Sequence, residues 1–471
     1  MRILKSILFI LKNNILLFDS EKKFIRFNKE KYSNRQNKSK ISKKDIILID
    51  LFNWGPYIII WSILVNFLSK KLHCEAKFYY IDLYQSRSSK YSFFLTKIKK
   101  IFSSFNVSEG INEYKFKYSK EKIHIYKNLF KNIKSKEDLI DFKYKSYDVG
   151  LLVYDTYVRI GNLPTVNLHD KKLETIFIRA LKALEEFLIF FEEYNVKCVL
   201  PGHLCYISYG IVAKIALKKN IPIVKINSKF RGNSFYRIHR IKDVLVDVAP
   251  YYKFKKEFEL FSDLEKEKYR KIGQNLINKR FSGEYDKNLP NMKLNQFNKK
   301  LETSDLLNNK KRKIFIFPHC YFDNPHKYRW MIFTDFYEQV KFLLNLSKET
   351  DNEFQWYYKP HPNELNKDLN LHTNLLKEYP NVYYLNKNVG HNHIISSKPD
   401  LIITNHGKVC HEYAYFNIPV INTGDNAHVN YNFSLNPKNK TELRDMVLNI
   451  DRYKNKIDFN KNYIHEYLYM D

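Results

Sequence analysis

A lysine and a histidine, each followed by proline, form the most chemically suggestive motif of the chain. Residues 356–362 read WYYKPHP, so Lys359 and His361 leave an apolar segment of strand length. Proline fixes its own φ and biases the preceding residue toward extended geometry, which predicts a stiff, non-helical loop. An ammonium point charge and a directional imidazole donor in such a loop suit a phosphate group. A solvated lysine in a proline-rich turn is the alternative.

A second polar loop, Asn405-His406-Gly407-Lys408, follows the apolar run LIIT and leads into a predicted helix over residues 408–416. Helical spacing divides that helix into two faces, the inward one with Val409, Tyr413 and Phe416 and the polar one with Lys408, His411, Glu412 and Tyr415. Free N–H groups at a helix N-terminus favour phosphate, and Glu412 suits ribose hydroxyls. A capping turn before a solvent-facing stripe is the alternative, which we expect for His411 and Tyr415.

Polar groups also follow two other apolar runs. The loop 318–330 contains Arg329, whose planar guanidinium pairs well with phosphate. The other polar members of this loop are His319, Asp323 and His326, and with Arg329 they are dense enough to line a cleft. A structured polar loop is the alternative. After the run IPVI come three secondary candidates, Asp425, Asn426 and His428.

These loops need strands to position them, and the sequence supplies two sets. Apolar runs of strand length are predicted as strands at 46–51, 76–83, 149–155, 197–203 and 221–227, and again at 313–319, 354–359, 401–404 and 418–421. Helical patterns, such as 57–72, 171–194 and 334–350, lie between them. Strands alternating with helices predict right-handed βαβ units and parallel sheets. Such sheets bind ligands at the carboxyl ends of their strands.

The order of these segments predicts the domain organisation. We expect a basic arm over 1–44, a Rossmann-like domain over 45–300 with a helical insertion near 86–145 and a closing linker, a second Rossmann-like domain over 311–440, and a helical tail over 441–471. The linker contains a long charged helix, predicted over 256–281. The fold class is therefore α/β.

Composition narrows the functional classes. The 471 residues include 80 Lys and Arg against 50 Asp and Glu, for a net charge of +30. That charge is compatible with nucleic acid, an anionic membrane or acidic small molecules, but it is dispersed and accompanies no nucleic-acid-binding motif. The five cysteines are odd in number and contain no CxxC pair, which suits a reducing compartment. No Walker loop, GxGxxG or GxSxG motif is present.

The N-terminal segment is apolar and basic without the pattern of an export signal. Its apolar run is broken at residues 12–14, and no small-residue cleavage site follows. Residues 1–45 hold thirteen Lys and Arg against four acids, which favours either a contact with an anionic membrane or a solvated tail. The apolar run near 46–68 is interrupted by Asp50, Asn53, Gly55 and Pro56, so a strand, a loop and a buried helix explain it better than a membrane span. We expect a cytoplasmic protein, with a peripheral contact at the inner membrane as a further expectation for the arm.

The stretch Ile314 to Gly424 resembles a known family. KPHP, the strand, turn and helix with Glu412, and then IPVI are similar to the capsule-polysaccharide glycosyltransferases, including the bacterial Kdo transferases. A similar Lys-His-Pro element occurs in the CDP-glycerol glycerophosphotransferases. The resemblance implies a GT-B fold, two Rossmann-like domains facing across a cleft, with the donor nucleotide bound mainly by the C-terminal domain. It also implies that Lys359 and His361 contact donor phosphate, that the 405–408 turn caps it, and that Glu412 holds the nucleoside. The small hydroxyl residue common in that turn is replaced here by Asn405-His406-Gly407.

Glycosyl transfer needs a base that deprotonates the acceptor hydroxyl. Two catalytic candidates end predicted strands of the first domain, Asp155 at the end of 149–155 and His203 at the end of 197–203. Weaker candidates are Asp50, His169 and Asp170. Each of these residues, taken alone, is also common as a helix cap or a hydrogen-bonded structural residue.

Together these features predict a GT-B glycosyltransferase that moves a sugar from a nucleotide sugar to a glycan or lipid-linked glycan acceptor of a surface polysaccharide. Glycerophosphate transfer from CDP-glycerol is the enzymatic alternative, and nucleic-acid binding is the alternative from another class. His391, His393, His406 and His411 have only loose ligand-like spacing. We therefore expect no metal and no cofactor.

Overall fold

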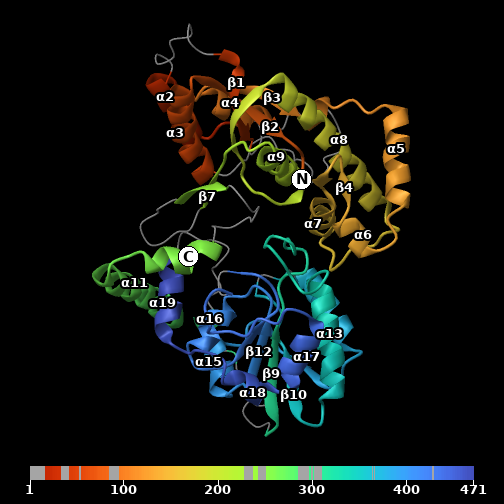
Figure 1. Ribbon diagram of the computed structural model, residues 1–471, viewed down its shortest axis with the longest axis vertical. Helices are drawn as coiled ribbons and strands as arrows, with labels where there is room; N and C mark the ends of the chain where they lie inside the picture. The colour runs from red at the N-terminus through yellow and green to blue at the C-terminus, as the bar shows by residue number, and fades with distance from the viewer. Residues whose placement is uncertain are drawn as a thin grey trace, which may run out of the picture. The chain divides into compact units, whose positions relative to one another are not determined.

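The structure is a computed structural model of the chain (Figure 1). It describes residues 16–32, 42–51, 55–83, 95–227, 237–241, 251–284, 296–298, 301, 310–362, 364, 366–426 and 429–470. Contacts divide the chain into two compact units. The first unit comprises Met1–Ile160, Asn167–Asn227 and Arg237–Asp247, and the second comprises Gly161–Val166, Ser228–Tyr236 and Val248–Asp471.

The first unit is built on a six-stranded sheet. Its strands are β1 (Ser42–Asp50), β2 (Cys74–Tyr80), β3 (Val107–Asn112), β6 (Asn195–Leu200), β7 (Ile223–Asn227) and β8 (Arg237–Ile241). The order is β3-β2-β1-β6-β7-β8, with parallel pairing throughout except between β7 and β8. The strand β1 lies in the middle, and residues 46–49 are fully buried. Buried on both faces, β1 reads in the sequence as a continuous apolar run.

Helices connect these strands. They are α2 (Asp19–Tyr32), α3 (Gly55–Leu72), α4 (Thr96–Ser103), α5 (Lys120–Lys131), α6 (Lys136–Ile140), α7 (Gly150–Gly161), α8 (Lys171–Glu193) and α9 (Tyr206–Lys218). A small antiparallel hairpin, β4 (Lys143–Tyr144) with β5 (Tyr147–Asp148), precedes α7.

Two predictions for this unit are wrong. The run 149–155 is not a strand, because it lies almost entirely in the helix α7. Residues 152–158 of α7 are all buried, so the polar face that would reveal a helical period is missing and the run resembles a buried strand. The insertion near 86–145 is only partly helical, because its described part also contains β3, a strand of the main sheet.

The second unit has a five-stranded, fully parallel sheet. Its strands are β9 (Arg312–Phe317), β10 (Phe354–Tyr358), β11 (Val382–Tyr384), β12 (Leu401–Thr404) and β13 (Val420–Asn422), in the order β11-β10-β9-β12-β13. The chain therefore starts at the central strand, moves outward on one side and then returns to the other. The crevice between β9 and β12 is the topological switch point of this sheet, the usual ligand site of such folds.

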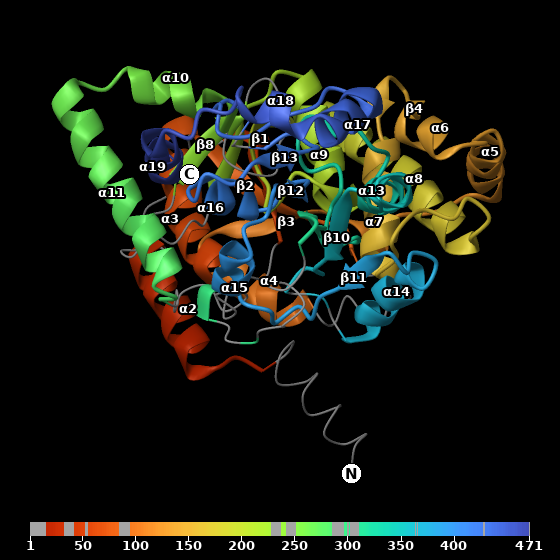
Figure 2. The ribbon, with the colours of Figure 1, turned by 90° about the horizontal axis from the view of Figure 1, so that it is seen from below.

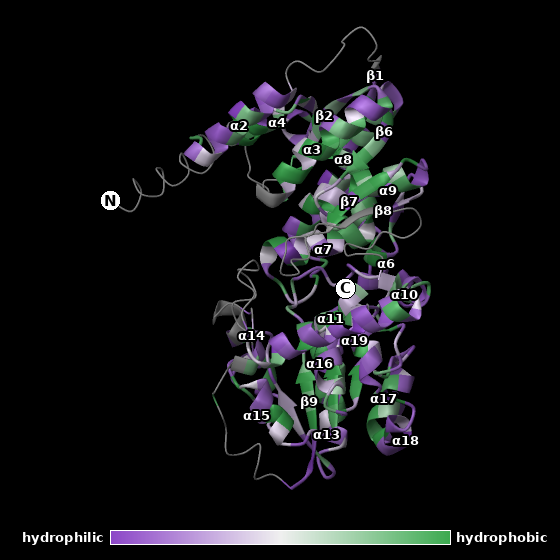
Figure 3. Cartoon of the chain, turned by 90° about the vertical axis from the view of Figure 1, so that its left-hand side faces the viewer, coloured by the Kyte–Doolittle hydropathy of each residue, from purple (hydrophilic) through white to green (hydrophobic). Residues whose placement is uncertain are grey.

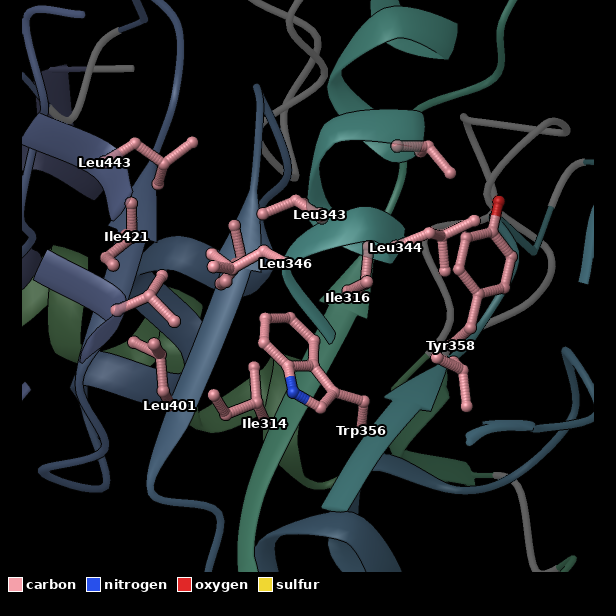
Figure 4. Packing of buried hydrophobic residues seen from close by; sticks show 14 of the residues in the cluster. Ile314, Ile316, Leu343, Leu344, Leu346, Trp356, Tyr358, Leu401, Ile421 and Leu443 are labelled. Atoms are coloured by element: carbon pink, nitrogen blue, oxygen red, sulfur yellow. The ribbon is translucent and has the colours of Figure 1, made fainter. Parts of the chain in front are cut away.

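The two faces of β9 bury different partners. Ile314 and Ile316 face a core that includes Trp356, Leu343 and Leu401 (Figure 4). Phe315 and Phe317 point to the opposite face, as the two-residue period of a strand requires. Further helices of the unit are α13 (Phe336–Glu349), α14 (Asn366–Leu376), α15 (His391–Ser396), α16 (Val409–Ala414), α17 (Lys440–Leu448) and α18 (Ile450–Lys454). Both sheets are thus covered by helices, and the predicted α/β class with two Rossmann-like domains is confirmed.

The charged stretch predicted as one helix over 256–281 forms two, α10 (Phe254–Glu259) and α11 (Asp263–Phe281). Ser262 separates them and makes a capping box with Glu265. The helix α11 lies beside the C-terminal helix α19, Lys461–Met470 (Figures 1 and 2). By contacts, α10 and α11 belong to the second unit, whereas the sequence placed the domain boundary after residue 300. Within the described ranges, no helix is both long enough and apolar enough to cross a bilayer.

The packing of α11 on α19 depends on a glycine. A Cβ atom at Gly273 would lie 2.0 Å from the carbonyl oxygen of His465. Gly273→Ala gains about 1 kcal/mol of helix propensity, but the forced separation of the backbones costs typically about 1–3 kcal/mol. We expect a lower thermal unfolding midpoint, measured by circular dichroism. Asn275→Ala, at an exposed position of the same helix, is the matched control and should not lower it. A Gly273→Ala variant as stable as Asn275→Ala would contradict the close contact.

Candidate functional site

Loops with polar side chains leave adjacent strands of the second unit at one edge. Because β9, β10, β12 and β13 are parallel, the segments 318–321, 359–362, 405–408 and 423–426 all start from the same edge of the sheet. This edge contains the switch point between β9 and β12. The strand order itself therefore brings these loops together.

Three histidines lie together at this edge, and we name them the histidine cluster: His319 after β9, His361 after β10 and His406 after β12. The ring of His319 contacts the rings of both others. The rings of His319 and His361 stack with centroids 5.5 Å apart. His406 meets His319 edge-on at 6.0 Å. Phe336, at the start of α13, packs against both His319 and His406, at 4.8 and 5.4 Å. From the sequence, His319 is one of four candidate cleft-lining groups in the loop 318–330, and its contact with His361 and His406 is not predicted.

The histidine cluster is held in its neutral form. Burial lowers the pKa of His319 to about 3 and of His361 to about 4, and it lowers the pKa of His406 well below the ordinary value. The ammonium group of Lys327 adds to the lowering at all three rings. The carboxylate of Asp323 opposes the lowering at His319 and His361, and that of Glu364 opposes it at His361. The site is therefore a set of uncharged rings with both a lysine and carboxylates nearby. Lys327 was not singled out from the sequence, since a lysine in a charged loop carries no distinguishing pattern.

His406 stands out because it is buried and unsatisfied. The residue is 8 % exposed, and neither ring nitrogen hydrogen-bonds to a described residue. Backbone groups of Pro325 and Asp425 approach the ring as weak acceptors that act to raise its pKa, although neither contact has the geometry of a full hydrogen bond. Tyr328 covers the ring at a centroid distance of 4.3 Å. Buried polar groups without partners are rare and costly in native proteins, and they call for a specific explanation.

His361 also contacts a cysteine, Cys320. Its Nδ1 lies 3.4 Å from the Sγ of Cys320. Burial raises the pKa of the Cys320 thiol, and the nearby carboxylate of Glu364 raises it further, so the sulfur is a protonated thiol. A thiol with a raised pKa is a poor nucleophile. This pair therefore orients the His361 ring and is not a cysteine-based catalytic centre.

Lys359 does not point freely toward a ligand. Its side chain is buried, and Nζ donates to Oε1 of Gln296 at 2.9 Å and to the carbonyl oxygen of Lys387 at 3.1 Å. Gln296 belongs to a short 3-10 turn, Gln296–Asn298, whose Phe297 stacks on His391 at 5.2 Å. The buried ammonium thus ties a segment of the expected linker to the edge of the second sheet. Sequence reasoning missed Gln296, because it lies 63 positions away in a stretch without secondary-structure signals.

Glu412 is buried rather than solvent-facing. It is 1 % exposed, and its Oε1 accepts from Nε of Arg280 at 2.6 Å. Burial acts to raise its pKa, but Arg280 and other nearby positive groups hold the pKa below its ordinary value. Its second oxygen, Oε2, has no hydrogen-bond partner among the described residues, and the same is true of Nδ1 of His391.

The predicted polar face of the helix at 408–416 is wrong. In α16, His411 and Glu412 are buried, whereas Phe416 is 38 % exposed. The cause is tertiary: His411 packs on Tyr467 of α19 at 5.1 Å, and Arg280 of α11 reaches Glu412. Helices from distant parts of the chain cover the side that the sequence assigned to solvent.

The remaining turn residues are tightly confined. Asn405 is fully buried and donates to Oε1 of Gln339 at 3.3 Å, while its own Oδ1 has no partner among the described residues. A Cβ atom at Gly407 would lie 2.6 Å from the hydroxyl of Thr404, so glycine permits the close turn. Lys408 is exposed at the start of α16. Since α16 has only six residues, its N-terminus offers little dipole to a phosphate.

Arg329 is bound to a carboxylate of its own chain. Its Nε donates to Oδ2 of Asp425 at 2.7 Å, its backbone N–H donates to the same oxygen, and Tyr251 donates a hydroxyl hydrogen bond there as well. The Asp425 carboxylate raises the pKa of Arg329 further above its ordinary value. Of the secondary candidates, Asn426 is buried and donates to Oδ1 of Asn422, and His428 lies outside the described residues.

The first unit has a corresponding switch point between β1 and β6. Asp50 ends β1, and its Oδ2 accepts the backbone N–H of Gly202 at 3.1 Å. Burial raises the pKa of Asp50 well above its usual value, with only the Gly202 hydrogen bond opposing the shift. His203 follows Gly202, is half-buried and lies against Tyr209 at 5.3 Å. Two of the catalytic candidates are therefore brought together at this edge.

The other catalytic candidates lie elsewhere. Asp155 is buried within α7, so the strand-end argument that ranked it first no longer applies. Asp170 caps α8 by accepting the N–H of Lys172 at 2.9 Å, which is an ordinary structural role. His169 is exposed. Among the described residues, no three His, Cys, Asp or Glu side chains are arranged to hold a metal ion.

No family model and no curated protein matches the sequence. Among solved structures, the chain is similar to a UDP-GlcNAc 2-epimerase from Neisseria meningitidis bound to UDP-GlcNAc, with 11 % identity, a TM-score of 0.27, and coverage of 89 % of this chain and 95 % of that one. It is similar to the beta Kdo 2,4 transferase KpsC of Thermosulfurimonas dismutans, with 12 % identity, a TM-score of 0.32 and coverage of 55 % and 82 %. It is also similar to the wall teichoic acid polymerase TagF, with 10 % identity, a TM-score of 0.23 and coverage of 95 % and 90 %.

Proposed function

We propose that the protein is a glycosyltransferase that uses a nucleotide-activated sugar, whose phosphate binds at the carboxyl ends of β9, β10 and β12. The observation that carries this proposal is His406, buried at the switch point with neither ring nitrogen in a well-formed hydrogen bond to a described residue. A bound phosphate oxygen would accept from such a ring. The acceptor that we propose is a glycan or lipid-linked glycan of a surface polysaccharide.

The charge state of the histidine cluster supports an anionic ligand. Each neutral imidazole offers one N–H donor, and Lys327 supplies positive charge beside all three rings. Arg329 and Glu412 are occupied by ion pairs inside the chain, and Asp425, the partner of Arg329, approaches His406 through its backbone. Phosphate is the group that neutral donors beside a cation suit best.

Donor and acceptor atoms suited to a nucleoside lie on the neighbouring part of the same edge. Oε2 of Glu412 and Nδ1 of His391 are buried, and neither has a hydrogen-bond partner among the described residues. A carboxylate oxygen accepts hydrogen bonds from the hydroxyls of a ribose. Gln296 and Phe297 cover this part of the edge in the structure, so a nucleoside would have to share or replace their contacts with Lys359 and His391.

A nucleotide panel tests the proposal. We expect at least one of UDP, GDP, CMP, CDP and CDP-glycerol to raise the thermal unfolding midpoint of the wild type. His406→Phe keeps the ring packing but removes both nitrogens, and it should weaken binding by about tenfold to a hundredfold, because hydrogen bonds to charged groups contribute about 1.5–3 kcal/mol. Isothermal titration calorimetry measures the loss. Binding of CDP-glycerol alone would favour the glycerophosphotransferase alternative, and CMP alone would favour an ulosonic acid donor.

His465→Phe is the matched control for this experiment. His465 is also a buried histidine with an Nε2 that lacks a partner among the described residues, but it lies in α19 against Tyr415 and makes no ring contact with the histidine cluster. Its substitution should leave nucleotide affinity unchanged. The proposal fails if no nucleotide stabilises the wild type, or if His406→Phe binds as tightly as His465→Phe. Binding that instead requires nucleic acid and falls steeply with salt would favour the nucleic-acid alternative.

Nucleotide binding should also take up protons. In the free protein, His319 and His361 have pKa values of about 3 and 4, and a bound phosphate raises them by favouring the charged form. Affinity should therefore increase as the pH falls from about 7 toward about 5. Calorimetry in two buffers of different ionisation enthalpy gives the number of protons bound. The measurement uses a nucleotide sugar, because a terminal phosphate such as that of CMP or UDP itself has a pKa of about 6 and can release a proton on binding. Proton release with the nucleotide sugar, or affinity for it that decreases as the pH is lowered over this range, would contradict phosphate binding at these rings.

For the base, we propose Asp50 in preference to Asp155. Asp50 ends the central strand of the first sheet, and its raised pKa suits a group that accepts a proton. A group whose folded pKa is raised contributes stability that is complete below its unfolded pKa, about 3.9, and is lost as the pH rises through the folded pKa. The buried carboxylate is therefore destabilising at neutral pH.

Asp50→Asn should remove that cost. The variant should have a higher thermal unfolding midpoint than the wild type at about pH 8, with a difference that vanishes near about pH 4, while transfer activity falls by about a hundredfold or more. Asp45→Asn, on the same strand but partly exposed, controls for the substitution itself. An Asp50→Asn variant less stable than the wild type in mild alkali would contradict the buried charge, and full activity would exclude Asp50 as the base.

A further inference from the structure

The helix α3 exposes a row of large apolar side chains. Ile59, Ile63 and Phe67 are 52 %, 58 % and 59 % exposed, and their spacing of four residues places them on one face. The opposite face, with Trp61 and Val65, is buried against the first sheet. The helix is apolar on nearly every side and is largely green in Figure 3. Helices of that composition are normally covered all round.

Basic side chains border this row. Lys70 and Lys71 are exposed in the last turn of α3. The helix α4 contacts both α3 and α2. Trp61 of α3 packs on Phe102 of α4 at 6.2 Å, and Asn28 of α2 donates to Ser104, the residue after α4, at 3.2 Å. The three helices therefore form one continuous part of the first unit.

The helix α2 also exposes apolar and basic side chains. Its exposed side chains include the aromatic Phe27, which is 55 % exposed, and several cations. Those cations are Lys22, Lys23, Arg26, Lys29 and Lys31. The combination of a large apolar group with flanking Lys and Arg is typical of helices that lie in the interface of a bilayer.

We propose that α3 and α2 form a docking face for an anionic membrane. The row Ile59, Ile63 and Phe67 enters the boundary between headgroups and acyl chains, and the bordering cations contact lipid phosphates. Charge favours a bilayer over a second copy of the chain as the partner. A second copy brings the same excess of cations within a chain of net charge +30, whereas an anionic bilayer supplies the opposite charge. This inference does not depend on the chemistry proposed for the second unit.

Vesicle flotation of the full-length protein tests the proposal. Wild type should bind vesicles of phosphatidylcholine with phosphatidylglycerol and bind far more weakly to phosphatidylcholine alone. The triple variant Ile59→Ser/Ile63→Ser/Phe67→Ser should lose at least about tenfold in partitioning. The matched control is Leu260→Ser/Leu264→Ser, which removes apolar groups that are 85 % and 80 % exposed in the second unit, and it should bind as the wild type does.

Two further measurements keep the proposal falsifiable. Phe67→Trp leaves the face apolar, and its tryptophan emission, taken as the difference from wild type, should shift to the blue when anionic vesicles are added, even if the triple variant folds poorly. Light scattering in the absence of lipid measures the mass of the wild type and the triple variant. Wild type that ignores anionic vesicles, a triple variant that binds like the wild type, an unshifted emission from the Phe67→Trp variant, or a dimer that the triple variant dissociates would each overturn the proposal.

Discussion

The parallel pairing of β9 with both β10 and β12 is the constraint on which the candidate site depends. Trp356 pairs with Ile314 on one side of β9, and Ile402 pairs with Phe315 on the other. This register fixes where the three strands end relative to one another. Residues 319, 361 and 406 lie two or three positions beyond these strand ends, so the register brings their rings near one another, with His319 in contact with the other two. The neutral cluster, with its incompletely hydrogen-bonded rings, is held in place because the hydrogen bonds and packing of the sheet outweigh its cost.

Charge neutralisation inside the second unit explains why several predicted ligand groups are occupied. A buried ion without a partner is costly, so each of these charges near the sheet edge is satisfied from within the chain. Glu412 forms an ion pair with Arg280, and Arg329 forms one with Asp425. Lys359 donates hydrogen bonds to Gln296 and to a backbone carbonyl. The histidines escape this requirement because they lose their charge instead. A neutral ring such as His406, whose nitrogens lack partners among the described residues, is what an arriving anion needs.

The sequence predicts where strands end better than it predicts the hydrogen-bond and ion-pair partners of the side chains found there. Alternating apolar runs and the proline-flanked Lys359 and His361 were sufficient to place both residues at the end of β10. They could not reveal that Lys359 hydrogen-bonds to Gln296, or that Glu412 pairs with Arg280, 132 positions away in the sequence. Such side-chain pairs depend on the tertiary path of the chain. The error at 149–155 has a related cause: α7 is buried on most of its surface, and burial erases the periodicity that distinguishes helix from strand.

The two switch points share a topology and differ in chemistry. Each sheet starts with its central strand, β1 or β9, and each switch point lies between that strand and the first strand added on its far side, β6 or β12. At the first, a carboxyl with a raised pKa accepts one backbone N–H; at the second, neutral imidazoles face a lysine. A buried carboxyl repels phosphate once ionised but accepts protons, whereas uncharged imidazoles beside a cation attract phosphate and take up protons only after it binds. Different residues at equivalent strand ends therefore give the two sheets opposite ligand preferences. This contrast favours anion binding in the second unit and proton acceptance in the first.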